Sequence, residues 1–145
     1  MNILVLQGPN LNLIGLRSAQ TGEQITLDKI NTGLRKHAHK INPEIQLKFL
    51  QTHKAEKAVS FVQRNRNKVD GVLIAPTSWG RFEFSLLEAI SLVGLPSIQI
   101  LLDNDYGTIS KDDSIFSSIC KESISGHPLT VFNHGLDILL DHISN

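Results

Sequence analysis

Three charged side chains and one tryptophan follow short apolar runs of this sequence and could take part in binding. Arg17 and Arg81 are cations that suit an anionic ligand, and Asp103 suits a hydroxyl or amine group. Trp79 stands just before Arg81 and could either pack in the core or line a pocket. If the fold brings these places together, they predict a site for a small polar or anionic metabolite.

Generic catalytic and metal-binding motifs are absent from the sequence. It contains no glycine-rich phosphate loop, no HExxH or CxxC pattern and no GxSxG nucleophile motif. His37 and His39 are separated by one residue, so on a helix they point to different sides and do not form a ligand pair. Cys120 is the single cysteine, which excludes an intramolecular disulfide and indicates a reducing compartment. The sequence therefore predicts no metal site.

Length and charge narrow the class of protein. A chain of 145 residues is expected to form one domain over residues 1–145. Its 14 Lys and Arg balance 14 Asp and Glu, which argues against binding nucleic acid or an anionic membrane through bulk charge. No apolar run reaches the roughly 18 residues of a membrane span, and the N-terminus lacks the features of a signal peptide. We expect a cytoplasmic protein with no nucleic-acid or membrane partner.

Hydrophobic periodicity predicts alternating strands and helices. Short apolar runs predict strands over residues 2–6, 45–50, 70–76, 96–102 and 129–132. Apolar residues at helical spacing predict helices over residues 27–41, 55–69, 82–93 and 135–143. Thr26 is the expected N-cap of the first of these helices. The polar stretch 103–118 is expected to be a loop that could hold a short helix.

This order of elements predicts an α/β fold. The expected architecture is a flavodoxin-like three-layer sandwich around a five-stranded parallel sheet with the strand order 2-1-3-4-5. Ligands of such sheets bind beyond the carboxyl ends of the strands, near the point where the strand order reverses. The expected binding region is therefore formed by the loops after Leu6, Pro76 and Leu102.

The segment from Leu6 to Arg17 carries the most specific motif of the sequence. It reads LQGPNLNLIGLR and closely resembles the signature of the type II 3-dehydroquinate dehydratases, small flavodoxin-like enzymes of the shikimate and quinate pathways. The order of the later elements also matches this family, so the resemblance covers nearly the whole chain. It implies self-association as trimers that commonly pack into dodecamers, and it implies neither a metal nor an organic cofactor.

The reaction of that family removes water through an enolate, so it needs a base, a group that stabilises the oxyanion, and an acid. The resemblance implies that Asn10 helps to hold a water beside the enolate. It also implies that Arg17 is the arginine at the start of the active-site lid, which lowers the pKa of a tyrosine base. Pro76 is retained, and Glu88 conservatively replaces an aspartate of the family.

Most other positions of the family's catalytic set carry different residues. The lid tyrosine that serves as the base is expected near Gly22, where no tyrosine occurs. The acid histidine and its orienting glutamate correspond to Leu101 and Gln99, neither of which can take over proton transfer. An asparagine, a histidine and a serine of the binding site correspond to Ala75, Arg81 and Asp103, and no arginine follows Arg81.

We therefore expect a dehydroquinase-like protein that has lost the dehydratase reaction and keeps a polar site. The residues expected at that site are Asn10, Arg17, Pro76, Arg81, Glu88, Leu102, Asp103 and Asn104. One alternative is an active but divergent dehydratase that uses Glu23 or Tyr106 as its base and water as its acid. Another alternative is a structural or assembly role. Equally, Tyr106 could cover apolar surface and Glu23 could be an exposed carboxylate without a role in binding.

Overall fold

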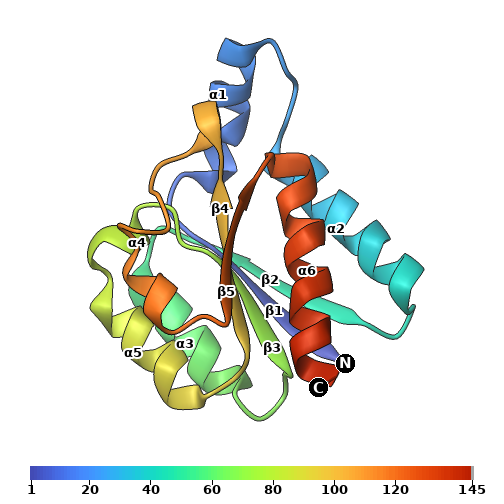
Figure 1. Ribbon diagram of the computed structural model, residues 1–145, viewed down its shortest axis with the longest axis vertical. Helices are drawn as coiled ribbons and strands as arrows, with labels where there is room; N and C mark the ends of the chain where they lie inside the picture. Colours follow the sequence, from blue (N-terminus) through green and yellow to red (C-terminus); the bar gives the residue numbers. More distant parts are fainter. Residues whose placement is uncertain (145) are drawn as a thin grey trace.

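Five parallel strands form a central sheet between two layers of helices (Figure 1). The computed structural model describes residues 1–144, apart from the side chain of Asn104. The strands are β1 (Asn2–Gln7), β2 (Gln46–Gln51), β3 (Gly71–Ala75), β4 (Ser97–Leu102) and β5 (Glu122–Gly126). They pair in the order β2-β1-β3-β4-β5, which confirms the predicted flavodoxin-like α/β fold.

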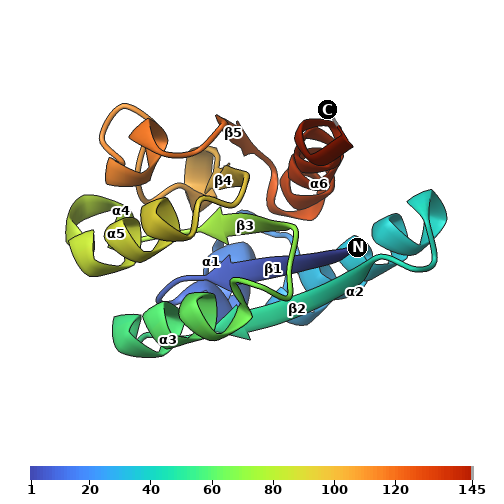
Figure 2. The same cartoon turned by 90° about the horizontal axis from the view of Figure 1, so that it is seen from below.

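Helices cover both faces of the sheet, as Figure 2 shows. One face carries α2 (Leu27–Ile41) and α6 (Pro128–Ser144). The other face carries α3 (Ala55–Asn65), α4 (Trp79–Phe82) and α5 (Phe84–Val93). Alternate residues of β1 enter the two cores, which explains why this central strand is apolar on both faces.

The predicted bounds of one helix are confirmed, and those of the next two helices differ from the structure. α2 begins after Thr26, whose hydroxyl oxygen accepts a hydrogen bond from the Lys29 N–H at 3.2 Å, as a cap should. α3 ends at Asn65, before the predicted residue 69, and the Asn65 amide donates to the Phe61 carbonyl at 2.9 Å. The next helix, predicted over residues 82–93, begins at Phe84 as α5, and Glu83, whose ψ of 74° is not helical, separates it from the short helix α4.

The predicted fifth strand, residues 129–132, is wrong. Those residues belong to α6, which also includes the predicted helix 135–143, and the fifth strand is β5. β5 lies at the edge of the sheet and pairs only with β4, so Glu122 and Ser125 are exposed and no apolar run marks the strand. The apolar residues that follow are buried at helical spacing, and they include Val131, Phe132, Leu136 and Leu139.

A helix that the sequence analysis did not predict, α1 (Ile14–Thr21), stands away from the sheet at the top of Figure 1. Only Ile14 and Ser18 of this helix are buried, so it lacks the broad apolar stripe by which core helices are recognised. Gly22 ends it with φ 81°, and the Ser18 hydroxyl oxygen accepts a hydrogen bond from the Ile25 N–H at 2.7 Å. We refer to α1 as the lid.

The polar stretch 103–118 is a loop with two 3-10 turns, Asn104–Tyr106 and Ile115–Ser118, in agreement with the predicted loop. The first turn contacts the lid, and the second contacts α4 and α5. Across residues 1–144, no helix has both the length and the apolar character needed to cross a membrane.

Candidate ligand pocket

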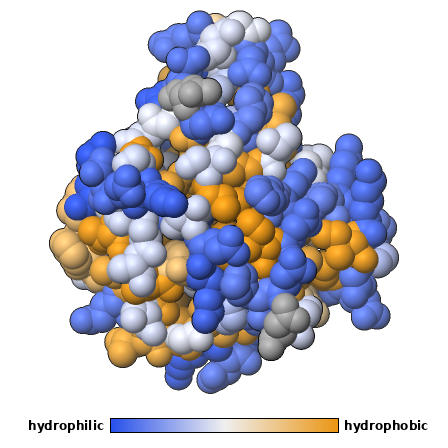
Figure 3. All heavy atoms as spheres, in the orientation of Figure 1, coloured by the Kyte–Doolittle hydropathy of each residue, from blue (hydrophilic) through white to orange (hydrophobic). Residues whose placement is uncertain are grey.

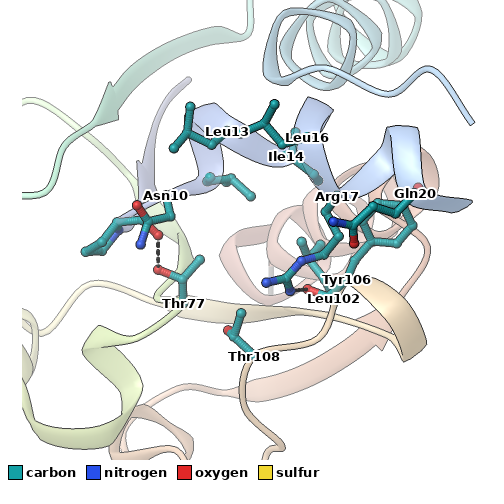
Figure 4. A pocket seen from close by; sticks show the side chains of 12 residues that line it. Asn10, Leu13, Ile14, Leu16, Arg17, Gln20, Thr77, Leu102, Tyr106 and Thr108 are labelled. Atoms are coloured by element: carbon teal, nitrogen blue, oxygen red, sulfur yellow. Dashed lines mark hydrogen bonds between the residues drawn. The ribbon is translucent and has the colours of Figure 1, made fainter.

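A pocket of about 360 Å³ opens at the carboxyl end of the sheet, between the lid and the turns that follow β3 and β4. Figure 4 shows its walls. The residues that line it are Pro9, Asn10, Leu11, Leu13, Ile14, Leu16, Arg17, Gln20, Thr77, Leu102, Tyr106 and Thr108. Parallel α/β sheets bind ligands at this edge, beside the point where the strand order reverses.

The floor of the pocket forms where the turn after β1 meets the turn after β3. The Gly8 N–H donates to the Ala75 carbonyl at 2.9 Å. A Cβ at Gly8 would clash with the Pro76 carbonyl, so only glycine permits this approach. The Thr77 hydroxyl donates to the Pro9 carbonyl at 2.9 Å (Figure 4). These contacts hold the two turns together at the base of the pocket.

Two residues of the pocket wall have backbone conformations that L-residues rarely adopt. Asn10 has φ 71° and Thr77 has φ 48°, both in the left-handed region. Asparagine tolerates this region, whereas a β-branched threonine is strained there, at a cost of about 1–3 kcal/mol. Strain of this kind is concentrated at functional sites, and here it marks the floor of the pocket.

Arg17 is the cation among the described residues of the pocket wall, and its guanidinium donates to the Tyr106 backbone carbonyl at 3.4 Å (Figure 4). Neutral hydrogen-bonding groups come from Asn10, Gln20, Thr77 and Thr108. No carboxylate or histidine occurs among the described residues of the wall. The wall therefore favours an anion, and Tyr106 is the one lining side chain that could act as an acid or a base.

The remaining wall is aliphatic. Leu11 and Ile14 are buried on its inner side. Leu13, directly before the lid, and Leu16, in its first turn, are 49% and 67% exposed. An apolar part of a ligand would remove these two leucines from water, which would favour binding.

A second polar cluster, formed by Glu23, Tyr106 and His127, connects the end of the lid with the loop after β4 and the start of α6. The Tyr106 hydroxyl donates to Glu23 Oε1 at 2.7 Å, and His127 Nε2 lies 2.9 Å from Glu23 Oε2. The hydrogen bond from Tyr106, followed by that from His127, holds the pKa of Glu23 below its usual range. Glu23 is outside the pocket wall, so its carboxylate does not face a ligand there.

Gln99 lies in a closed network of neutral groups. Its side chain is fully buried, and its amide nitrogen donates to the hydroxyls of Ser117 and Ser123 at 3.0 and 2.7 Å. Its amide oxygen accepts a hydrogen bond from the Ser114 hydroxyl. Leu101 is also buried. At the two positions where the resemblance implies a glutamate and a histidine, the protein therefore has a satisfied amide and an aliphatic side chain.

The structure brings three of the predicted site residues into one wall: Asn10, Arg17 and Leu102. Pro76 is buried beneath the floor, and its carbonyl faces Gly8 rather than the pocket. The side chain of Asn104 lies outside the described part of the chain.

The other predicted residues lie away from the pocket wall. Arg81 is exposed and donates to the Thr108 carbonyl at 2.8 Å, so it supports a lining residue from behind. Glu88 is exposed on α5, and Asp103 is half-buried after β4. Trp79 is 2% exposed and packs in the core under α3 and α5, so it has a structural role. No group of three or more His, Cys, Asp or Glu residues suited to a metal ion occurs within the described residues.

Thr77 and Thr108 of the pocket wall and His127 beside Glu23 were not predicted from the sequence. Thr77 directly follows Pro76 at the predicted end of a strand, and residues at such strand ends are candidates for a binding site. His127 directly precedes Pro128, and proline is favoured at the first position of a helix. The sequence therefore offered a signal that His127 is the N-cap of a helix. Nothing in the sequence distinguishes Thr108 from the other polar residues of its loop.

Comparisons with known proteins agree with this fold. Residues 1–140 match the family described as Dehydroquinase class II. The 3-dehydroquinate dehydratase of Carboxydothermus hydrogenoformans is 29% identical over 144 residues, which cover 99% of this chain and 92% of that protein. The 3-dehydroquinate dehydratase of Pelotomaculum thermopropionicum is 33% identical over 127 residues, with 88% and 85% covered.

The crystal structure of type II dehydroquinase from Butyrivibrio crossotus has the same fold. It superposes with a TM-score of 0.82 at 20% sequence identity, and the match covers 97% of each chain. The superposition shows the same fold, and the match over residues 1–140 places the protein in the class II dehydroquinase family, which confirms the resemblance seen in the sequence.

Proposed function

We propose that this protein binds a small organic monoanion in the lid pocket and does not catalyse the dehydration for which its relatives are named. The observation that carries the proposal is the composition of the wall. It offers one cation, Arg17, and no carboxylate or histidine among its described residues. A pocket of this kind can hold an anion, but it lacks the pair of proton-transfer groups that an elimination requires.

The missing groups correspond to specific positions. The lid ends at Thr21, and neither its last residues nor Gly22 and Glu23, which follow it, include a tyrosine to act as a base. The position expected for the acid is Leu101, which cannot donate a proton. Each general acid or base contributes about 10²–10⁴-fold to a rate, so the loss of both leaves little turnover.

The ligand class follows from the same wall. A carboxylate suits the Arg17 guanidinium, which can donate two parallel hydrogen bonds. Neutral side chains, among them Asn10 and Gln20, can bind one or two hydroxyl or carbonyl groups. The aliphatic side of the pocket favours a ligand with an apolar body over one that is polar on every side.

The rival proposal, an active but divergent dehydratase, depends on Tyr106. Glu23 is poorly suited as the base because its pKa is lowered and it is absent from the pocket wall. Tyr106 lines the pocket, but its hydroxyl hydrogen is directed to the Glu23 carboxylate. Under the rival proposal, a Tyr106→Phe variant would lose all turnover of 3-dehydroquinate.

Turnover decides between the two proposals. The purified protein is incubated at high concentration with 3-dehydroquinate, beside an active relative, and the absorbance of the conjugated enone product is followed. We expect no turnover above the uncatalysed background. Turnover within about 100-fold of the relative that disappears in Tyr106→Phe would establish the rival, since one general base supplies about that factor.

Calorimetric titration tests the binding proposal. The probes are benzoate, cyclohexanecarboxylate and acetate, compared with benzamide, which lacks the charge. We expect the two larger carboxylates to bind more tightly than acetate, and Arg17→Ala to weaken them by at least about tenfold, as expected for one charge-assisted contact. Arg66→Ala, which removes an exposed arginine directly after the end of α3 and outside the pocket wall, is the matched control. Equal affinities for benzoate and benzamide would overturn the proposal.

An assembly role has support from a different surface. Phe82, Phe84 and Leu92 are 60%, 62% and 80% exposed on α4 and α5. Apolar side chains reach the surface over these helices in Figure 3. The proposed trimers or dodecamers would cover such side chains, since large apolar groups left in water favour association. Light scattering that gave only a monomer would contradict this role.

A further inference from the structure

We infer that Glu23 and His127 are positioning residues that fix Tyr106, and through it the lid and Arg17, in the arrangement that forms the pocket. We refer to Glu23, Tyr106 and His127 as the latch. The inference rests on the proposed function only where it concerns ligand affinity, because the state of the lid can be measured without a ligand.

Tyr106 contacts the lid at two separate points. Its hydroxyl donates to Glu23 Oε1 at 2.7 Å and lies 3.0 Å from the Thr21 hydroxyl, at the end of the lid. Its backbone carbonyl accepts the hydrogen bond from Arg17, in the middle of the lid (Figure 4). The side chain is 5% exposed and belongs to the core under α2 and α6. Tyr106 therefore joins the lid to the rigid part of the fold.

His127 provides the second anchor, and its contacts define its tautomer. Its Nδ1 accepts a hydrogen bond from the Leu129 N–H at 3.2 Å, so in the neutral ring the hydrogen is on Nε2. Nε2 then donates to Glu23 Oε2 at 2.9 Å. The two oxygens of one carboxylate thus accept from two different elements, the loop after β4 and the start of α6. The His127 and Tyr106 rings also meet edge to face, with centroids 6.0 Å apart.

The lid has few other attachments. Only Ile14 and Ser18 of α1 are buried, and the helix projects beyond the body of the molecule in Figure 1. Elements with little buried apolar surface open at low free-energy cost. Beside the buried hydrogen bond from the Ile25 N–H to the Ser18 hydroxyl, the latch is the main restraint on the end of the lid, and the position of Arg17 depends on it.

Hydrogen exchange of the backbone amides of residues 14–22, followed by mass spectrometry without ligand, tests the latch. We expect Glu23→Ala to accelerate exchange of this segment about tenfold, the equivalent of losing one or two charge-assisted hydrogen bonds. Tyr106→Phe should produce a similar change without losing the ring. Glu23→Gln retains one carbonyl oxygen in place of two carboxylate oxygens. Exchange of residues 14–22 in this variant should therefore lie between that of the wild type and that of Glu23→Ala.

Glu122→Ala is the matched control. Glu122 pairs with His142 at 3.0 Å near the other end of α6, at an exposure similar to that of Glu23. Its removal should leave exchange of residues 14–22 unchanged. Wild-type exchange rates in Glu23→Ala and Tyr106→Phe would overturn the latch, and so would equal acceleration in Glu122→Ala.

Benzoate affinity separates the latch from the proposed function. With both correct, Glu23→Ala weakens benzoate binding and Glu23→Gln restores part of it, while the melting temperatures of the two variants remain close. Loss of binding in Arg17→Ala with unchanged exchange in Glu23→Ala would overturn the latch and keep the function. Accelerated exchange in Glu23→Ala with no carboxylate binding by the wild type would keep the latch and overturn the function.

Discussion

Two polar clusters, one around Gln99 of β4 and the other the latch, satisfy their hydrogen bonds with different kinds of group. Around Gln99, three serines satisfy a neutral amide that is fully buried. In the latch, a phenol and an imidazole satisfy the Glu23 carboxylate, whose side chain is 42% exposed. Burial of a charge costs far more than burial of a hydrogen-bonded amide, so the carboxylate lies where water still reaches it.

The two clusters also have different roles in this protein. The resemblance implies a glutamate and a histidine near the Gln99 cluster, yet the protein has no proton-transfer group at positions 99 and 101. A glutamate does pair with a histidine at the end of the lid, where the two residues hold a movable element in place. The first cluster therefore stabilises the fold, and the second adjusts the pocket.

The largest effect is expected from exchanging the amide for a carboxylate in the buried cluster. Gln99→Glu should lower the free energy of unfolding at pH 7 by about 2–4 kcal/mol, because a charge enters a site built for a neutral group. Urea denaturation measures this change. Burial would raise the pKa of the new carboxyl, so the loss should shrink towards pH 5, where the folded state keeps the proton.

The matched exchange at the surface is Gln63→Glu on α3, which should change stability by less than about 0.5 kcal/mol. If Gln99→Glu were equally mild at pH 7, water would have to reach the cluster, and the contrast between the two regions would be lost.

A smaller effect is expected from removing one partner of the buried amide. Ser114→Ala leaves the Gln99 amide oxygen without its donor, which should cost about 1–3 kcal/mol in urea denaturation. Ser118→Ala, an exposed serine of the neighbouring 3-10 turn, is the control. A cost for Ser114→Ala no larger than that for Ser118→Ala would mean that the network does not stabilise the loop.

The difference between buried and exposed elements explains which parts of the fold could be predicted from the sequence. The central strands β1, β3 and β4 are buried on both faces, so their residues form the apolar runs that identified them. β5 has one neighbouring strand and an exposed, polar sequence, so it had no such signal. The lid has too little buried surface for a helical stripe to appear.

The site was predicted where it depends on chain order and missed where it depends on tertiary contact. The fold class places a binding loop after the first strand, and the resemblance selects Asn10 and Arg17 within it. Thr77 lines the pocket with a positive φ, a backbone conformation that a threonine in the sequence does not indicate. His127 meets Glu23 across 104 positions of the sequence, a contact that only the folded chain creates.

The smallest effect is expected from the pH dependence of the latch. The pKa of Glu23 is lowered in the folded protein, so the stability that its charge contributes is fully present above the usual value of 4.5. This contribution is lost as the pH falls through the folded-state pKa. The difference in melting temperature between wild type and Glu23→Gln should therefore shrink as the pH falls below the usual value of 4.5.

Tyr106→Phe sharpens this last prediction, because the hydrogen bond from Tyr106 is the principal cause of the lowered pKa of Glu23. In a Tyr106→Phe background, the difference that Glu23→Gln makes should be smaller and should disappear at a higher pH, closer to the usual value. A difference that instead grew at acid pH would mean that the carboxylate opposes the folded state. A charge would then destabilise the latch as it does the Gln99 cluster, and the two clusters would no longer differ.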